Sequence, residues 1–294
     1  MARLHVILVF FKKFIAQKGD RFGSIRRRCE ENLDQVITLL RWKIITKSKA
    51  CYFDGIPRIA LITVNFSTTR YLKLMLLTLC EQAGLSMIYR IIIVDNDSRD
   101  GGQIFLRNLA KNIGCIELIE NNYFTSHARG LRIGFSNLEK IEADCTQEKT
   151  NLLLFCDTDI IFLNPKTLLD ITNSLIESNA ALAGELRYDL YPYPEAQASF
   201  FLLRRDCYLN PNVVPFVNHG APAYWMQRSL WKSGFHLENF PGNHGGYILH
   251  RGRSSIHATL KYNRGSSYST VHNHLPHYMG VPGGDKIWKS IEEK

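Results

Sequence analysis

Short apolar runs alternate along the chain with segments whose apolar residues recur every three or four positions. Four of these runs have the length and composition of buried strands: residues 59–64, 90–94, 115–119 and 152–156. The segments between them are typical of helices: residues 70–82, 103–113 and 126–138. Strands and helices that alternate through short connections predict an α/β domain with a mostly parallel sheet and right-handed crossovers.

The pattern continues beyond Pro165 and also covers the amino terminus. It predicts helices at 166–178 and 221–233, and strands at 180–186, 199–204 and 247–251. Residues 1–50 read as helical, most clearly at 32–45. We therefore predict three parts: a basic helical extension (1–54), an α/β domain (55–260, with halves 55–165 and 166–260) and a flexible tail rich in Gly, Ser, Asn and Tyr (261–294).

Three of the predicted strand ends in the first half carry acidic or amide residues that are candidates for a site. Asn65 ends the first, Asp95 and Asp97 follow the second, and Asp157 and Asp159 follow the fourth. Because ligands bind outside the carboxyl ends of strands in open α/β sheets, we expect these side chains to line one crevice. Two carboxylates beside a buried strand are costly unless something pairs with them. Mg²⁺ or Mn²⁺ shared with a substrate phosphate is a suitable partner, and a plain polar turn is the alternative.

The motifs of two common nucleotide-binding classes are missing from the sequence. There is no G-x-G-x-x-G and no P-loop lysine, so a dinucleotide oxidoreductase or an ATPase is not expected. A carboxylate after the second strand, such as Asp95, can instead hydrogen-bond a ribose hydroxyl or a base N–H. Asp95 and Asp97 also form an Asp-x-Asp that competes for the metal, but Asp157 and Asp159 follow the more apolar strand.

The positive charge of the chain is concentrated at its amino terminus. The net charge is +9 for 294 residues, and residues 1–50 carry +8 of it, so the remainder is close to neutral. A nucleic-acid-binding domain would carry a basic face on its body, so nucleic acid is not an expected partner. Basic residues beside the apolar run 4–11 suit attachment to an anionic membrane surface. A solvated basic helix packed on the domain or on a partner fits the pattern equally well.

Two further features favour a cytoplasmic protein. The run 4–11 is too short to span a bilayer, and no small-residue cleavage site follows it. The seven cysteines include no Cys-x-x-Cys pair, which favours free thiols in a reducing compartment. We therefore expect a cytoplasmic location, peripheral on the inner face of the membrane if the extension binds lipid.

Four segments, in order, resemble the family 2 nucleotide-sugar glycosyltransferases of GT-A fold. They are IALITVNFSTTRYLKLMLLTL, RIIIVDNDSRDGG, NNYFTSHARGLRIGF and FCDTDI, and the resemblance covers residues 57–250. It implies a GT-A domain that binds a nucleotide-diphosphate sugar donor, with a nucleotide-binding half before the acceptor half. It places Asp95 at the nucleoside, Asp97 nearby, and Arg129 with its helix start at the diphosphate or sugar.

The resemblance also implies a metal site. The Asp-x-Asp of FCDTDI makes Asp157 and Asp159 the ligands of Mg²⁺ or Mn²⁺, with Asp157 also beside the donor. The segment YILHR resembles a late strand whose histidine the family often uses beside the metal, so His250 is a candidate third ligand. Three histidines of the tail are rivals: His272, His274 and His277.

Several positions depart from the family pattern. Tyr123 stands where a glycine is usual, and Gly130 where an asparagine is usual. In the family a Glu-Asp pair precedes the helix predicted at 221–233, and its Asp is the catalytic base. Those places hold His219 and Gly220, and no carboxylate lies between residues 218 and 232. His219 is therefore a candidate base, because an imidazole accepts a proton near neutral pH.

Glu185 and Asp189 are the next candidates for the base, from the preceding strand and loop. The resemblance implies an inverting, metal-dependent hexosyl- or deoxyhexosyl-transferase acting on a polysaccharide or lipid-linked acceptor. The Tyr- and Pro-rich loop at 187–195 suits sugar stacking or packing within the loop, and the tail suits the acceptor side. The alternatives are a retaining GT-A transferase, a sugar-phosphate nucleotidyltransferase, and a catalytically silent nucleotide-sugar-binding or scaffold protein.

Overall fold

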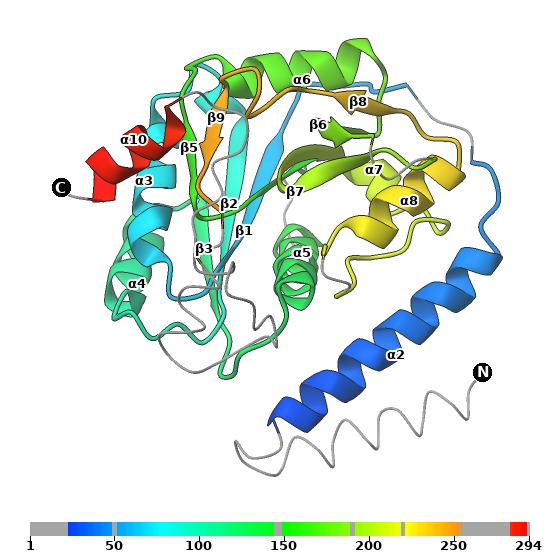
Figure 1. Cartoon of the computed structure of the whole chain (residues 1–294), viewed down its shortest axis with the longest axis horizontal. Helices are drawn as coiled ribbons and strands as arrows, with labels where there is room; N and C mark the ends of the chain where they lie inside the picture. Colours follow the sequence, from blue (N-terminus) through cyan, green and yellow to red (C-terminus); the bar gives the residue numbers. More distant parts are fainter. Residues whose placement is uncertain are drawn as a thin grey trace.

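The computed structural model describes residues 23–48, 52–143, 149–188, 192–218, 221–252, 254 and 283–292. A central sheet lies between two layers of helices, and helix α2 lies along one side of this body (Figure 1). None of the described helices is long and apolar enough to cross a bilayer.

The central sheet has seven strands in the order β3-β2-β1-β4-β7-β6-β8. Their bounds are β1 Ile59–Asn65, β2 Ile88–Asp95, β3 Ile116–Glu120, β4 Leu152–Cys156, β6 Leu182–Arg187, β7 Glu195–Arg204 and β8 Leu237–Asn239. The first four are mutually parallel, whereas β7 is antiparallel to both β4 and β6. A second, antiparallel sheet pairs β5 (Ile160–Phe162) with β9 (Ile248–His250). The predicted α/β class with a mostly parallel sheet is confirmed.

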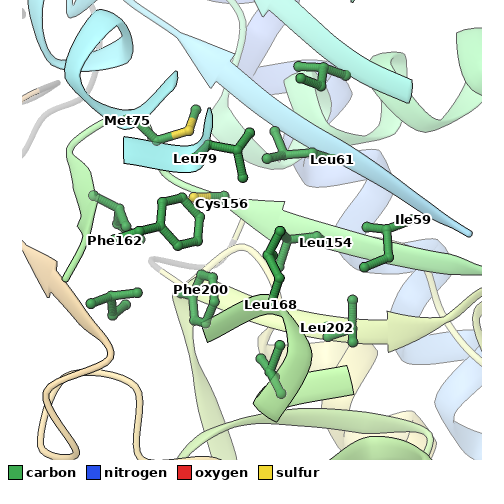
Figure 2. Close-up of a cluster of buried hydrophobic side chains, with 14 of the residues drawn as sticks. Ile59, Leu61, Met75, Leu79, Leu154, Cys156, Phe162, Leu168, Phe200 and Leu202 are labelled. Carbon is green, nitrogen blue, oxygen red and sulfur yellow. The ribbon is translucent and has the colours of Figure 1, made fainter. Parts of the chain in front are cut away.

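Helices cover both faces of the sheet because the side chains of its inner strands alternate between two cores. Ile59 and Leu61 point to one core, and Ala60 and Ile62 to the other. The first core is covered by α3 (Thr69–Cys80), α4 (Gln103–Asn112) and α6 (Thr167–Glu177), and Figure 2 shows part of it, including Met75, Leu79 and Leu168. The second is covered by α5 (His127–Ala143), α7 (Arg205–Tyr208) and α8 (Tyr224–Lys232). The remaining described helices are α2 (Gly23–Lys43), the short η2 (Leu85–Met87) and α10 (Gly284–Glu292).

Two glycines let α5 approach the sheet closely. A Cβ on Gly130 would lie 2.8 Å from a methyl group of Val64, and one on Gly134 would lie 2.7 Å from a methyl group of Ile62. Both distances are below van der Waals contact, and both neighbours are β-branched, so they have little freedom to move away. Close packing of α5 on β1 therefore explains why Gly130 departs from the asparagine that the family resemblance implies.

Two further details of the fold concern the start of α3 and the predicted tail. Thr68 holds the N-cap position of α3, and the amide of Thr69 donates to Asp100 Oδ2 at 2.8 Å. Ser67, the preceding residue, has a φ of 52° and accepts a hydrogen bond from the amide of Arg99. Within the predicted tail, residues 283–292 include α10, whose Trp288 is buried against Tyr71. The rest of the predicted tail beyond residue 254 lies outside the described residues.

The close approach of α5 predicts that Gly134→Ala destabilises the protein. The higher helix propensity of alanine stabilises by up to about 1 kcal/mol. The clash with Ile62 costs roughly 1–3 kcal/mol, since the core is closely packed. We expect a net loss in the free energy of unfolding, measured by denaturant titration. Gly114→Ala is the control, because no atom lies within 4 Å of its added Cβ. A Gly134→Ala protein as stable as the parent would contradict this packing.

Candidate functional site

The carboxyl ends of three strands lie together at one edge of the sheet. Asn65 and Asp95 are register partners at the ends of β1 and β2, and β4, the other neighbour of β1, ends just before the turn Asp157–Asp159. The hydroxyl of Thr158 in this turn lies 2.8 Å from that of Thr68, which donates to the side-chain oxygen of Asn65 at 2.9 Å. Hydrogen bonds thus link the turn after β4 to the end of β1.

The small second sheet brings a histidine to this turn. After Asp159 the chain enters β5, where Ile160 is the register partner of His250 on β9. The amide of Arg251 donates to the backbone oxygen of Asp159 at 3.0 Å. The pairing of β5 with β9 therefore holds His250 beside the Asp-x-Asp, although 90 residues separate them in the sequence.

Asp157, Asp159 and His250 form a compact group with one potential ligand atom each, all within 4.8 Å of one another. Nε2 of His250 lies 3.3 Å from Oδ1 of Asp159 and 3.7 Å from Oδ2 of Asp157. Asp159 is buried, and Asp157 and His250 are partly buried. Nδ1 of His250 is buried with no hydrogen-bond partner among the described residues, so Nε2 is the nitrogen that faces the carboxylates.

Burial and charge act against each other on these three groups. Burial raises the pKa of Asp159, but the charge of His250 and hydrogen bonds from His250 and Ser254 outweigh it and lower this pKa to about 2. Burial lowers the pKa of His250, but the carboxylates of Asp159 and Asp157 outweigh it and raise this pKa. Burial raises the pKa of Asp157, although the charge of His127 opposes it. The two carboxylates therefore favour a positive charge between them, which the protonated imidazole supplies.

A divalent cation can supply the same positive charge. Carboxylate oxygens suit both Mg²⁺ and Mn²⁺, and an imidazole nitrogen is a common metal ligand. The set of two carboxylates and one imidazole therefore suits a divalent cation. Within the described part of the chain, it is the one group of at least three acidic, histidine or cysteine side chains close enough to share an ion.

His127 is a site residue that the sequence did not single out. It is the first residue of α5, and its Nε2 lies 3.5 Å from Oδ1 of Asp157. The two oxygens of Asp157 thus face different histidines, since Oδ2 faces His250. The sequence could have indicated His127 by its position. It lies two residues before Arg129, at the start of the helix predicted at 126–138. A partly exposed imidazole there can meet an anion beside the metal ligands.

The residues after β1 and β2 form a dense polar network. The side-chain amide of Asn65 donates to Asp95 Oδ1 at 2.9 Å and to Ser98 Oγ at 3.0 Å. Asp95 is buried, and burial raises its pKa, although hydrogen bonds from Ser98 and Asn65 oppose the shift. Asn96 accepts from both the amide and the hydroxyl of Thr125. These contacts hold the loop after β2 in place. The roles of Asn65 and Asp95 toward a nucleoside remain predictions.

The two other residues assigned to the donor lie in the loop after β2 and at the start of α5. Asp97, in that loop, has a φ of 61° and pairs with Arg99 at 3.5 Å. Arg129, in the first turn of α5, donates to the hydroxyl of Tyr123 at 3.2 Å. Tyr123, which stands where the family resemblance implies a glycine, therefore holds the guanidinium of Arg129.

Glu185 is bound to the loop that precedes β9. Its Oε2 accepts from the amides of Asn243 at 2.6 Å and His244 at 3.1 Å, and its Oε1 pairs with the His244 ring. Asn243 in turn accepts the amide of His250 on its Oδ1 at 3.1 Å. These contacts link Glu185, through one asparagine, to the strand that carries the candidate metal ligand.

The other two candidate bases, His219 and Asp189, lie outside the described residues, as do the rival ligands His272, His274 and His277.

The comparisons with known proteins bear on the fold. No family model and no curated protein sequence matches the chain. Residues 1–349 of S. aureus TarS resemble it with a TM-score of 0.50 and 11% identity, over 70% of this chain and 64% of that one. This likeness shows the fold alone: the chain has a glycosyltransferase fold of the GT-A kind. The chain spans less than two thirds of that structure.

Two other solved structures are similar at lower scores. TarS in complex with UDP-GlcNAc has a TM-score of 0.48 and 11% identity, over 63% of this chain and 56% of that one. The mannosyltransferase PcManGT from Pyrobaculum calidifontis, in complex with GDP-Man and Mn²⁺, has a TM-score of 0.49 and 13% identity, over 88% and 76%.

The protonation of His250 predicts a pH dependence for metal binding. A metal and a proton compete for Nε2, so the affinity for Mn²⁺ should rise with pH until His250 is deprotonated. Since the pKa of His250 is raised, this rise should extend above the usual histidine value of about 6.5, at about tenfold per pH unit below the pKa. Calorimetric titration with Mn²⁺ at several pH values measures it.

The control is His250→Asn, which removes the titrating nitrogen. It should bind Mn²⁺ more weakly and with a shallower pH dependence over the same range. An affinity of the parent that stays level or falls as the pH rises would show that His250 does not bind the ion.

Proposed function

We propose that this chain is a metal-dependent glycosyltransferase that moves a sugar from a nucleotide-diphosphate sugar to a hydroxyl group of an acceptor. The observation that carries the proposal is the Asp157, Asp159 and His250 group at the carboxyl edge of a glycosyltransferase fold. Ligands of open α/β sheets bind at this edge. Carboxylates clustered there serve a metal–diphosphate complex better than they serve an uncharged ligand.

In this proposal Asp157, Asp159 and His250 hold Mn²⁺ or Mg²⁺. When bound, the ion supplies positive charge where negative charge develops on the leaving diphosphate. His127 and Arg129, both in the first turn of α5, face the same diphosphate, and the positive end of the helix dipole adds to their charge. Asp95 and Asp97 with Asn65 are assigned to the nucleoside.

The transfer is proposed to invert the anomeric carbon, as the family resemblance implies, with a hexose or deoxyhexose as the sugar. A base would deprotonate the acceptor hydroxyl in line with the departing diphosphate. His219 is the proposed base, and Asp189 is the alternative. Glu185 is less suited, because both of its oxygens already bind the loop at Asn243 and His244. Leaving that loop would free the strand that carries His250.

The acceptor is proposed to be a polysaccharide or a lipid-linked sugar, and the protein to be cytoplasmic and peripheral at the inner face of the membrane. The positive charge of residues 1–50 supports this location.

A retaining transferase is the alternative within the same fold. A catalytically silent nucleotide-sugar-binding protein is the alternative outside enzymes, and the missing carboxylate between residues 218 and 232 favours it. A measurement of donor hydrolysis in the absence of acceptor distinguishes an active transferase from a catalytically silent binding protein.

The metal assignment predicts that Asp159→Asn removes metal-dependent donor binding. Without one carboxylate the site loses a ligand, so Mn²⁺-dependent affinity for UDP-GlcNAc or GDP-Man, measured by calorimetry, should fall on the order of a hundredfold. Asp54→Asn is the control, because Asp54 is exposed and precedes the amino end of β1, at the opposite edge of the sheet. A variant at Asp159 that binds donor like the parent would refute the metal assignment.

The base assignment predicts that His219→Ala lowers turnover at saturating donor by about 10²–10⁴-fold with little change in donor affinity. Asp189→Asn and Glu185→Gln are measured beside it. Glu185→Gln should instead weaken Mn²⁺ binding, because its carboxylate holds the loop before His250. If His219→Ala turns over like the parent, and Asp189→Asn or Glu185→Gln loses turnover even at saturating Mn²⁺, the base is that carboxylate.

A further inference from the structure

Helix α2 lies against the domain through its polar side. The side chains of Gln35 and Arg41 donate hydrogen bonds of 3.0 Å to backbone oxygens in the segment 211–218. Asp34 pairs with an arginine of α5. Thr38, between these positions on the helix, is 2% exposed. A surface helix ordinarily turns its apolar stripe to the core, so this arrangement is the reverse of the usual one.

An aromatic and cationic cluster fixes the rotation of α2. The ring of Trp42 lies 5.4 Å from that of Trp225 and 6.0 Å from that of Tyr193. The ammonium group of Lys232 on α8 lies 4.4 Å from the Trp42 ring and donates to the Trp42 backbone oxygen at 2.6 Å. With these contacts on one side, the helix cannot turn its opposite side inward without losing them.

The opposite side of α2 is an exposed apolar stripe. Val36, Ile37, Leu40 and Ile44, which we name the outer stripe, recur at helical spacing and are 53%, 42%, 59% and 74% exposed. Lys43, beside the stripe, is exposed too. Four large apolar residues in one line on a helix of 21 residues, roughly 30 Å long, form a contiguous apolar surface of the kind that marks an interaction site.

We propose that the outer stripe is a docking surface for an anionic lipid bilayer. Interfacial helices insert an apolar line of this kind at the boundary between headgroups and acyl chains. The charge of +8 on residues 1–50 decides between a bilayer and a second copy of the chain. Association of two copies would bring two such positively charged segments together, whereas acidic headgroups would neutralise them. The polar side of α2 meanwhile stays bound to the domain.

This inference names the surface behind the proposed membrane location, but its test needs neither donor nor acceptor. Full-length protein is sedimented with vesicles of phosphatidylcholine alone or mixed with phosphatidylglycerol. The double variant Leu40→Glu with Ile44→Glu removes half of the outer stripe. The matched control is Leu77→Glu with Ile104→Glu, residues that are 64% and 71% exposed on α3 and α4. Both variants change the net charge equally, and α3 and α4 cover the other face of the sheet (Figure 1).

The parent and the control should bind vesicles that contain phosphatidylglycerol, and the stripe variant should bind on the order of a hundredfold less, because two apolar anchors are lost. Thermal unfolding and donor binding should be alike in all three proteins, which separates this result from a failure of the proposed function. Equal vesicle binding by both variants, or no binding by the parent, would overturn the proposal. A dimer of the parent that dissociates in the stripe variant, without vesicle binding, would show that the stripe binds a second copy.

Discussion

Two carboxylates held beside each other at the end of a buried strand are the constraint on which the site depends. Asp157 and Asp159 follow β4, whose five residues are buried and which pairs with β1 on one side and β7 on the other, so the turn cannot move outward to separate its charges. Carboxylates in such a place require a positive partner. His250 supplies one as an imidazolium, and the same geometry suits a divalent cation. A bound metal ion and a protonated His250 are therefore two alternative ways to neutralise the same pair of carboxylates.

The rest of the domain serves to hold that arrangement. β5 and β9 pair over only three residues each, yet this pairing places His250, and the hydrogen bonds from Glu185 through Asn243 secure the approach to it. On the other side, the glycines of α5 bring the helix close to β1, so that His127 at its first turn reaches Asp157. Two short strands and one helix start thus converge on a single turn.

The sequence predicted the framework because its signals were local. The apolar runs and their polar ends were sufficient to predict the parallel strands and the Asp-x-Asp turn, and the resemblance pointed to His250. The strands β5 and β8 have three residues each, which is too short for an alternation of apolar and polar residues to predict them. His127 carried no pattern of its own, because its meaning comes from where a helix start lies against another strand. The contacts of Glu185 depend on a loop 58 residues later in the chain. Periodicity showed that α2 has two faces, but only its tertiary contacts show that the polar face is turned to the domain.

Diffraction from crystals grown with Mn²⁺ and a nucleoside diphosphate tests the central claim most directly. The anomalous signal of manganese locates the ion without reference to activity. We predict a peak within roughly 2.0–2.3 Å of one oxygen each of Asp157 and Asp159 and of Nε2 of His250, with the diphosphate on its open side. A manganese peak at another group of residues, or none beside these three side chains with the nucleotide bound, would contradict the account.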